Sequence, residues 1–172
     1  MGTASHAYDA QPKVMTSPAG FAELYELRYD AVYRVALRVT GNLTDAEDVL
    51  QTVFLRILAR RDRLDTDHLP EAYFRRAAAN AAVDLLRRRA THAESHLDEA
   101  SAHAAFESPA LLKERLRRAI AALEPADAEM FLLRYVEGMS NGELAEMYDL
   151  EKNNIGVRLH RIRQTLQAEM NR

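Results

Sequence analysis

The chain has 172 residues, of which 48% are hydrophobic and 28% are charged, a balance typical of a folded soluble protein. Its formal net charge is −3, so any surface that binds nucleic acid must be local and offset by acidic residues elsewhere. The absence of cysteine excludes disulfides, thiolate metal sites and cysteine nucleophiles. No apolar run approaches membrane-spanning length and the first residues lack the pattern of a secretory signal, so we expect a cytoplasmic protein without membrane insertion.

The first part of the chain predicts a tail followed by a helix. Residues 1–20 mix Ala, Ser, Thr, Pro and Gly without periodicity, which is typical of a flexible tail. Apolar residues then recur at helical spacing from Phe21 to Leu37. Gly41 and Asn42 are expected to end that helix.

A second helix is predicted to begin with a capping box of Thr44 and Glu47. Its regular apolar stripe consists of Ala46, Val49, Leu50, Val53, Phe54, Ile57 and Leu58. The opposite side begins with Asp45, Glu47 and Asp48. The helix dipole alone is a sufficient reason for acids at this end, so these residues do not by themselves indicate a docking surface.

A charged connector from Arg60 to His68 precedes a third helix, for which Pro70 is the expected first residue and Ala90 the last. Its apolar stripe is Tyr73, Phe74, Ala77, Ala81, Leu85 and Leu86. Another face of this helix carries a polar line that consists of Arg76, Asn80, Asp84 and Arg87. Arg88 and Arg89 extend this line. Arginines near a helix C-terminus suit the dipole and could form a solvated face. Asparagine in mid-helix favours a binding role instead, because it disfavours the helix and its amide can read a base edge.

Residues 91–108 change in character, with small and acidic side chains and no Lys or Arg, and predict a flexible acidic linker between two domains. His92, His96 and His103 lie in it. No matching carboxylate or histidine set completes a metal site, so we favour a solvated linker over a metal sensor and expect no metal or cofactor.

Two further helices are expected after the linker. Pro109 opens the first, which runs to Leu123. Residues 126–137 form the second, closed by Gly138.

The last part of the chain predicts a helix-turn-helix unit. Ser140 and Glu143 form a capping box, and Asp149 stands at the turn, where aspartate tolerates the left-handed conformation. The following helix has an inward stripe of Ile155, Leu159, Ile162 and Leu166. Its outer face is polar and basic: Asn153, Asn154, Gly156, Val157, Arg158, His160, Arg161 and Arg163. Two short helices around a tight turn are common in bundles as well as in duplex-reading domains, so this pattern alone leaves both open.

Nothing in the sequence assembles an active site. Serines lie in caps and tails, and there is no glycine-rich phosphate loop or nucleophile elbow. We therefore expect a protein that is not an enzyme.

Four segments taken together resemble the extracytoplasmic-function (ECF) group of bacterial sigma factors: DAEDVLQTVFLRIL, YFRRAAANAAVDLLRRR, LEPADAEMFLLRYVEGMSNGELAEMYDL and VRLHRIRQTL. They occur in the family's order, over about residues 21–170. The resemblance implies an all-α subunit of RNA polymerase with two small helical domains. These are a region 2-like domain at 21–90 and, beyond the linker 91–108, a region 4-like helix-turn-helix domain at 109–172.

The resemblance also implies three surfaces. Docking on the clamp helices of the largest subunit of core RNA polymerase is implied for Asp45, Glu47, Asp48, Gln51 and Phe54. Contact with the downstream (−10) promoter element, where a strand is opened and a base leaves the stack, is implied for Arg75, Arg76, Asn80, Asp84, Arg87 and Arg88, with the connector 60–69 helping to form the pocket. Contact with the upstream (−35) element in the major groove is implied for Asn153, Asn154, Gly156, Val157, Arg158, His160 and Arg161.

Two departures and two alternatives accompany this interpretation. Gly156 and Val157 stand where the family often has a basic or polar side chain, and Asp149 replaces the usual glycine of the turn, which leaves the upstream sequence preference open. Family members commonly have an anti-sigma partner, which is expected here too. The alternatives are a free-standing helix-turn-helix regulator and a sigma-derived interaction protein that no longer reads DNA.

Overall fold

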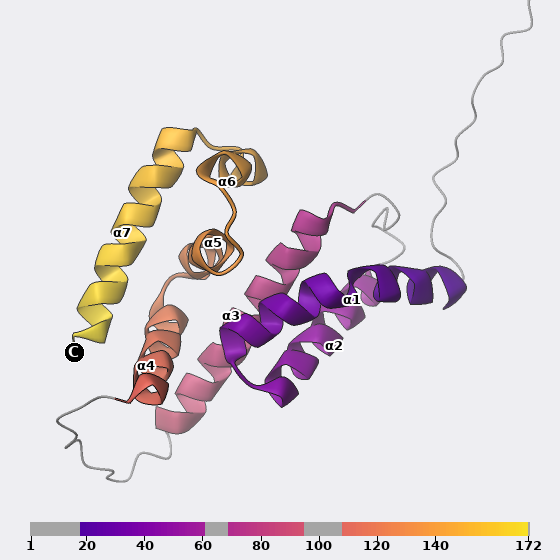
Figure 1. Cartoon of the computed structure of the whole chain (residues 1–172), viewed down its shortest axis with the longest axis horizontal. Helices are drawn as coiled ribbons and strands as arrows, with labels where there is room; N and C mark the ends of the chain where they lie inside the picture. The colour runs from indigo at the N-terminus through magenta and orange to yellow at the C-terminus, as the bar shows by residue number, and fades with distance from the viewer. Residues whose placement is uncertain (1–17, 61–68, 95–107, 172) are drawn as a thin grey trace, which may run out of the picture.

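The computed structural model describes residues 18–60, 69–94 and 108–171, and within these ranges all regular structure is helical (Figure 1). The helices are α1 (Pro18–Thr40), α2 (Leu43–Ala59), α3 (Glu71–Glu94), α4 (Pro109–Ala122), α5 (Pro125–Tyr135), α6 (Asn141–Tyr148) and α7 (Lys152–Met170). The predicted all-α fold is confirmed. The predicted tail up to residue 17, the connector 61–68 and most of the linker, including His96 and His103, lie outside the described residues.

The first three helices bury the apolar stripe of α2 between α1 and α3. The predicted α2 stripe is buried except for Leu58, which is half-buried. Phe54 lies at the centre of an aromatic cluster, with its ring centroid 6.1 Å from that of Phe21 and 6.4 Å from that of Phe74. Burial of such large side chains is the main favourable term in this half of the fold.

Several helix ends differ from the sequence predictions. Helix α1 begins at Pro18, inside the predicted tail, α4 ends at Ala122 rather than Leu123, and α5 spans Pro125–Tyr135 rather than 126–137. Asn42, with extended backbone, caps α2 by accepting a hydrogen bond from the Asp45 N–H, so α2 begins before the predicted Thr44 box. The short amide side chain of Asn42 reaches this N–H as well as a hydroxyl would. Helix α3 begins at Glu71 rather than Pro70, and it continues past the predicted end to Glu94.

The helix-turn-helix prediction is confirmed in detail. Ser140 and Glu143 form the reciprocal capping box of α6, and Asp149 ends that helix in the left-handed conformation, at φ 52° and ψ 49°. The inward stripe of α7 is buried as predicted. The Ser140 backbone N–H donates to the Glu143 carboxylate at 2.7 Å, and this bond and the Ser140 hydroxyl lower the pKa of Glu143.

We expect Ser140→Ala to lower the free energy of unfolding by about 1 kcal/mol, because the first turn of α6 loses its side-chain acceptor. Ser140→Thr keeps the hydroxyl and is the control. Urea denaturation measures both. Because the pKa of Glu143 is lowered on folding, its contribution is present at neutral pH and is lost as the pH falls through the folded-state pKa, below the normal glutamate range. A Ser140→Ala protein as stable as the control at neutral pH would contradict the role of this cap.

Helix α3 lies between the two halves of the molecule, with α1 and α2 on one side and α4 and α5 on the other (Figure 1). Small buried side chains run through its middle and allow close approach on more than one face: Ala78, Ala79, Ala81 and Ala82. The helices expected to form two domains are therefore in direct contact, and their buried residues form one continuous core. The linker signal in the sequence does not predict this packing.

Candidate nucleic-acid interface

Two arginines of the polar line of α3, Arg76 and Arg87, contact the C-terminal half of the molecule. Arg76 pairs with Glu129 of α5, with 2.7 Å between Arg76 Nε and Glu129 Oε1, and its guanidinium lies 4.9 Å from the ring centroid of Tyr148. Glu129 is only 4% exposed and also accepts a hydrogen bond from the Tyr148 hydroxyl. The pKa of the Tyr148 hydroxyl is raised, mainly by burial and also by its hydrogen bond to Glu129. Tyr148 therefore remains a neutral hydrogen-bond donor.

The other residues of the line have separate partners. Arg87 donates to the backbone carbonyls of Ala121, at 3.1 Å, and Leu123, at the end of α4. Asp84 pairs with Arg56 of α2 at 3.1 Å. Asn80, which lies between Arg76 and Asp84 in the helix, is half-buried, and Arg88 is exposed.

Arg75 pairs with Glu71 one turn earlier in α3, at 2.5 Å, and its Nε lies 4.0 Å from Glu137 Oε2, just beyond α5. The sequence predicts the line itself. It does not predict that Arg75, Arg76 and Arg87 are in contact with the C-terminal half, because the carboxylates and carbonyls involved lie far away in the chain.

The acidic start of α2 divides into buried and exposed parts. Asp45 is 2% exposed and pairs with Arg89, and Phe54 is 3% exposed in the core. In this structure α3 and α1 cover both side chains, and the contact of these two residues with polymerase stays a prediction. Glu47, Asp48 and Gln51 are exposed.

Two exposed leucines of α2 did not enter the sequence prediction. Leu43 and Leu55 are each 63% exposed, and Leu55 follows Asp48 and Gln51 along one helix face. A leucine that falls outside the buried stripe of an amphipathic helix is the sequence signal that could have identified them. Together, Glu47, Asp48, Gln51 and Leu55 form what we call the α2 acidic face.

The outer face of α7 is open to solvent. Asn153, Asn154, Val157, His160 and Arg161 are exposed, and Gly156 lies among them. Arg158 is held by Asp127 of α5, with 2.6 Å between its Nε and the carboxylate oxygen. This pair fixes α7 against the rest of its domain.

Packing within the protein does not require glycine at position 156. A Cβ there would meet Asn141 Nδ2 at 3.9 Å, an ordinary van der Waals distance. Glycine in a helix costs about 1 kcal/mol relative to alanine, and no contact within the protein accounts for it here.

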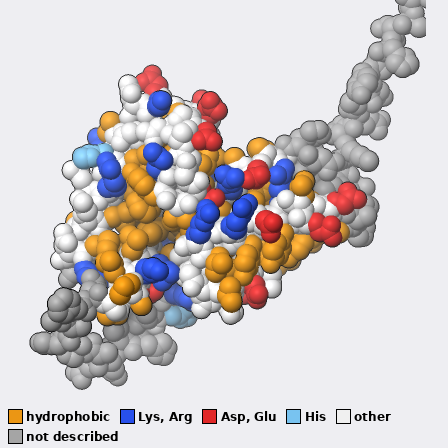
Figure 2. Space-filling view, in the orientation of Figure 1, with side chains coloured by type: hydrophobic (Ala, Val, Ile, Leu, Met, Phe, Trp, Pro, Cys, Tyr) orange, Lys and Arg blue, Asp and Glu red, His pale blue; other side chains and the backbone are white. Residues whose placement is uncertain are grey.

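The two basic surfaces therefore differ in accessibility. The exposed residues of the α7 face are open to solvent, whereas Arg75, Arg76 and Arg87 of α3 contact the other half of the protein. Figure 2 shows Lys and Arg side chains gathered, with acidic side chains among them, where α5 meets α1 and α3. No helix in the described ranges is both long and apolar enough to span a membrane.

Comparison with known proteins gives matches to two families and to many individual sequences. The family described as Sigma-70 region 2 matches residues 24–92, and Sigma-70, region 4 matches residues 113–166. The RNA polymerase sigma-E factor of Streptomyces coelicolor is 30% identical over 157 residues, covering 87% of this chain and 85% of that protein. The ECF RNA polymerase sigma factor SigW of Bacillus subtilis is 22% identical over 165 residues, covering 87% and 88%.

Among solved structures, that of CnrH in complex with the cytosolic domain of CnrY has the same fold. It matches with a TM-score of 0.52 and 24% identity, covering 91% of this chain and 90% of that one.

Proposed function

Since the chain belongs to the ECF group of the sigma-70 family, we propose that its three surfaces divide the work of a sigma factor between polymerase, opened DNA and duplex DNA. The protein is a sigma factor: it acts with RNA polymerase in promoter-specific initiation of transcription. Residues 21–90 would form the polymerase-binding and strand-opening domain, 91–108 the linker, and 109–172 the duplex-reading domain.

The α2 acidic face is the surface that docks on core polymerase. Its carboxylates are exposed, and Leu55 at its C-terminal end supplies apolar contact beside the polar side chains, a mixture found in specific interfaces. Asp45 and Phe54 support this face by holding α2 in place. Phe54 fills the core beneath α2, and Asp45 pairs with Arg89 of α3.

The α3 line binds the opened strand at the downstream element. Arginines hold phosphates, and Asn80 offers an amide to a base that has left the stack. The line is continuous along one helix, so the spacing of its side chains is fixed by the helix itself.

Helix α7 reads the upstream element from the major groove. Its exposed amides, His160 and Arg161 can contact base edges and phosphates, and Val157, which is 52% exposed, can contact a thymine methyl group. Gly156 lets the backbone come close to the duplex.

The observation that carries this proposal is the exposed α2 acidic face and the α3 line on one domain, together with the solvent-facing α7 on the other. The test is in-vitro transcription with purified core polymerase. Only a sigma factor gives specific transcripts that depend on this protein; a free-standing regulator or a sigma-derived protein that no longer reads DNA gives none. A genome-wide map of the transcript starts would then identify the promoter sequence.

Asn80→Ala should reduce strand opening about tenfold while leaving binding to core polymerase unchanged, because a good base contact contributes about 1–3 kcal/mol. Alanine favours the helix, so loss of α3 is not the cause. Permanganate reactivity of unpaired thymines measures opening, and a pull-down with core polymerase measures binding. Gln164→Ala, at an exposed position of α7, is the control. Equal losses in both assays would contradict the role of Asn80.

Three further properties follow from the proposed function. The protein works without catalysis of its own, and in the cytoplasm, where its polymerase is. It is restrained by an anti-sigma factor that covers the same surfaces, a partner that co-purification from the source cell would identify.

A further inference from the structure

A cavity of about 120 Å³ lies between the end of α1, the second half of α3 and the middle of α4. Its wall includes three arginines, Arg89, Arg117 and Arg118, and one carboxylate, that of Glu114. The wall is therefore positively charged, although the whole chain has a net charge of −3. None of these four residues belongs to the three surfaces of the proposed function.

Arg117 is fixed at this cavity by the end of α1. Its Nε donates to the Val39 carbonyl at 3.1 Å. Its guanidinium also lies over Gly41, which has a left-handed φ of 67°, and a Cβ there would lie 3.0 Å from Arg117 Cζ. The remaining contact of the group is Glu114, 3.5 Å from Arg117 Nη1, and the Glu114 side chain is 58% exposed. An exposed pair of this kind is weak, so another anion can replace Glu114 at little cost.

Arg89 is fixed in a similar way from the opposite side. It pairs with Asp45, whose side chain is only 3% exposed, whereas the Arg89 side chain itself is 55% exposed. A guanidinium has five N–H donors in a rigid fork. The pair with Asp45 therefore orients the fork and leaves donors for a second acceptor at the cavity.

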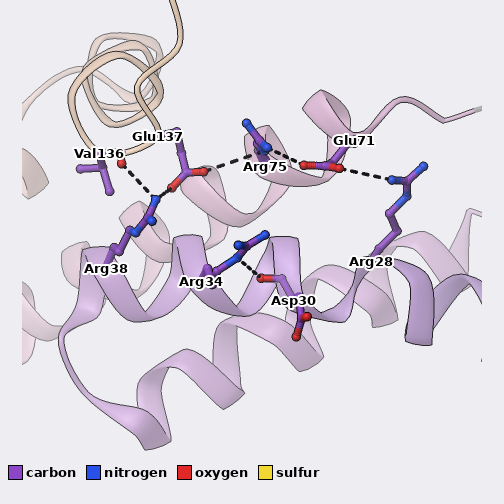
Figure 3. Close-up of polar contacts among 8 residues, drawn as sticks. All are labelled: Arg28, Asp30, Arg34, Arg38, Glu71, Arg75, Val136 and Glu137. Carbon is purple, nitrogen blue, oxygen red and sulfur yellow. Dashed lines mark hydrogen bonds and ion pairs between the residues drawn. The ribbon is translucent and has the colours of Figure 1, made fainter.

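Arg118 lines the cavity without a hydrogen-bond or ion-pair partner among the residues that the structure describes. Arginines elsewhere in the molecule are neutralised by acids. Arg75, for example, lies between the carboxylates of Glu71, at 2.5 Å, and Glu137, at 4.0 Å (Figure 3). The cavity wall thus has a cationic side chain that no acid of the described protein neutralises.

The charge and size of the cavity indicate the class of ligand. If Glu114 turns to solvent, three guanidinium groups and one buried carboxylate, that of Asp45, remain, an excess of two positive charges. A phosphate monoester carries a charge of about −1.5 to −2 at pH 7, so it matches this excess better than a carboxylate does. Pockets for drug-sized ligands measure about 300–1,000 Å³, so this cavity has room for a phosphate group and not for a larger body.

We propose that this cavity binds a small phosphate dianion, either free phosphate or the phosphate group of a monoester, between Arg89, Arg117 and Arg118. Each guanidinium donates charge-assisted hydrogen bonds to the phosphate oxygens. Arg89 and Arg117 are already oriented by Asp45 and by the Val39 carbonyl, so little side-chain freedom is lost on binding. Glu114 competes with the ligand for Arg117.

The first experiment is calorimetric titration of the full chain with inorganic phosphate, with sodium chloride at equal ionic strength as the blank. The unaltered chain should bind phosphate at one saturable site. Arg118→Gln should weaken binding about tenfold, because a hydrogen bond to a charged group is lost. Arg163→Gln makes the same charge change at an exposed position of α7 and should leave the affinity unchanged. Equal affinities of these two variants, or no saturable binding by the unaltered chain, would overturn the proposal.

Glu114→Gln tests the competing carboxylate. It should tighten phosphate binding about threefold, because an exposed ion pair no longer opposes the ligand. Weaker binding by this variant would contradict the arrangement proposed. Adenosine 5′-monophosphate distinguishes the two sources of the anion. Its competition with inorganic phosphate would assign the site to monoesters, and binding of inorganic phosphate alone would assign it to the free ion.

The second experiment locates the ligand by amide NMR of the full chain during the same titration. Phosphate should shift the amide resonances near Thr40, Arg89 and Arg118, which come from the three helices around the cavity. The amides of the exposed basic face of α7 should not respond. Equal shifts there would mean that phosphate acts as a general counter-ion of exposed cations, and the cavity would then not be a site.

Discussion

Replacing Phe74 by alanine is expected to lower the free energy of unfolding by about 3–5 kcal/mol, because the change leaves a cavity in the centre of the N-terminal half. Phe74 is fully buried, its ring lies 6.4 Å from that of Phe54 and 5.7 Å from that of Tyr73, and the Arg28 guanidinium lies 5.4 Å from its centroid.

Urea denaturation followed by circular dichroism is the measurement, and Phe74→Leu is the control. Leucine retains much of the apolar volume, so we expect it to lose clearly less stability than alanine. The alanine variant should lose binding to core polymerase and to DNA together, since α2 and α3 both rest on this core. A loss below about 1 kcal/mol would mean that the helices around Phe74 close the cavity, contrary to the packing described.

Asp48→Arg should weaken binding to core polymerase at least about tenfold and abolish transcripts at matched concentrations, because reversing a charge on an interface opposes both encounter and docking. Asp48 is exposed on the α2 acidic face, so the fold itself should not change. Titration of core polymerase with labelled protein gives the affinity. Unfolding in urea verifies that stability is retained.

Glu26→Arg is the matched control, since it makes the same charge change at an exposed position of α1. It should bind core polymerase normally. Undiminished binding by Asp48→Arg would remove this residue from the docking surface. Asn80→Ala should thus impair strand opening and retain polymerase binding, whereas Asp48→Arg should impair polymerase binding first.

The parts of the fold that the sequence predicts well are those set by neighbouring residues. The capping box of Ser140 and Glu143, the left-handed Asp149 and the buried stripe of α7 each depend on interactions within a few positions of the chain. Such features need no knowledge of the tertiary structure. The cap of α2 shows the limit of even local rules. The sequence prediction placed the cap at Thr44, whereas Asn42, which it assigned to the end of the preceding helix, has the extended backbone and caps α2.

The site was less predictable because burial depends on distant partners. Asp45 has the sequence context of an exposed helix-start acid, yet Arg89 from another helix covers and pairs with it. Phe54 lies on the apolar stripe, so its burial could be predicted from periodicity, whereas family position suggested a contact residue. The arginines of α3 would give the same pattern whether they faced DNA or a protein carboxylate, and only the structure places Glu129 beside Arg76.

The hydrogen bonds from Arg87 to Ala121 and Leu123 have a consequence for helix α4. Carbonyls in the last turn of a helix have no partner inside it, and here a side chain from a different helix provides one. If Arg87 leaves to hold a nucleic acid, the end of α4 loses this support and should fray, so its amide hydrogens should exchange faster. Binding of DNA at α3 would then raise the hydrogen-exchange rate of amides at the junction of α4 and α5, so exchange at this junction would report promoter binding.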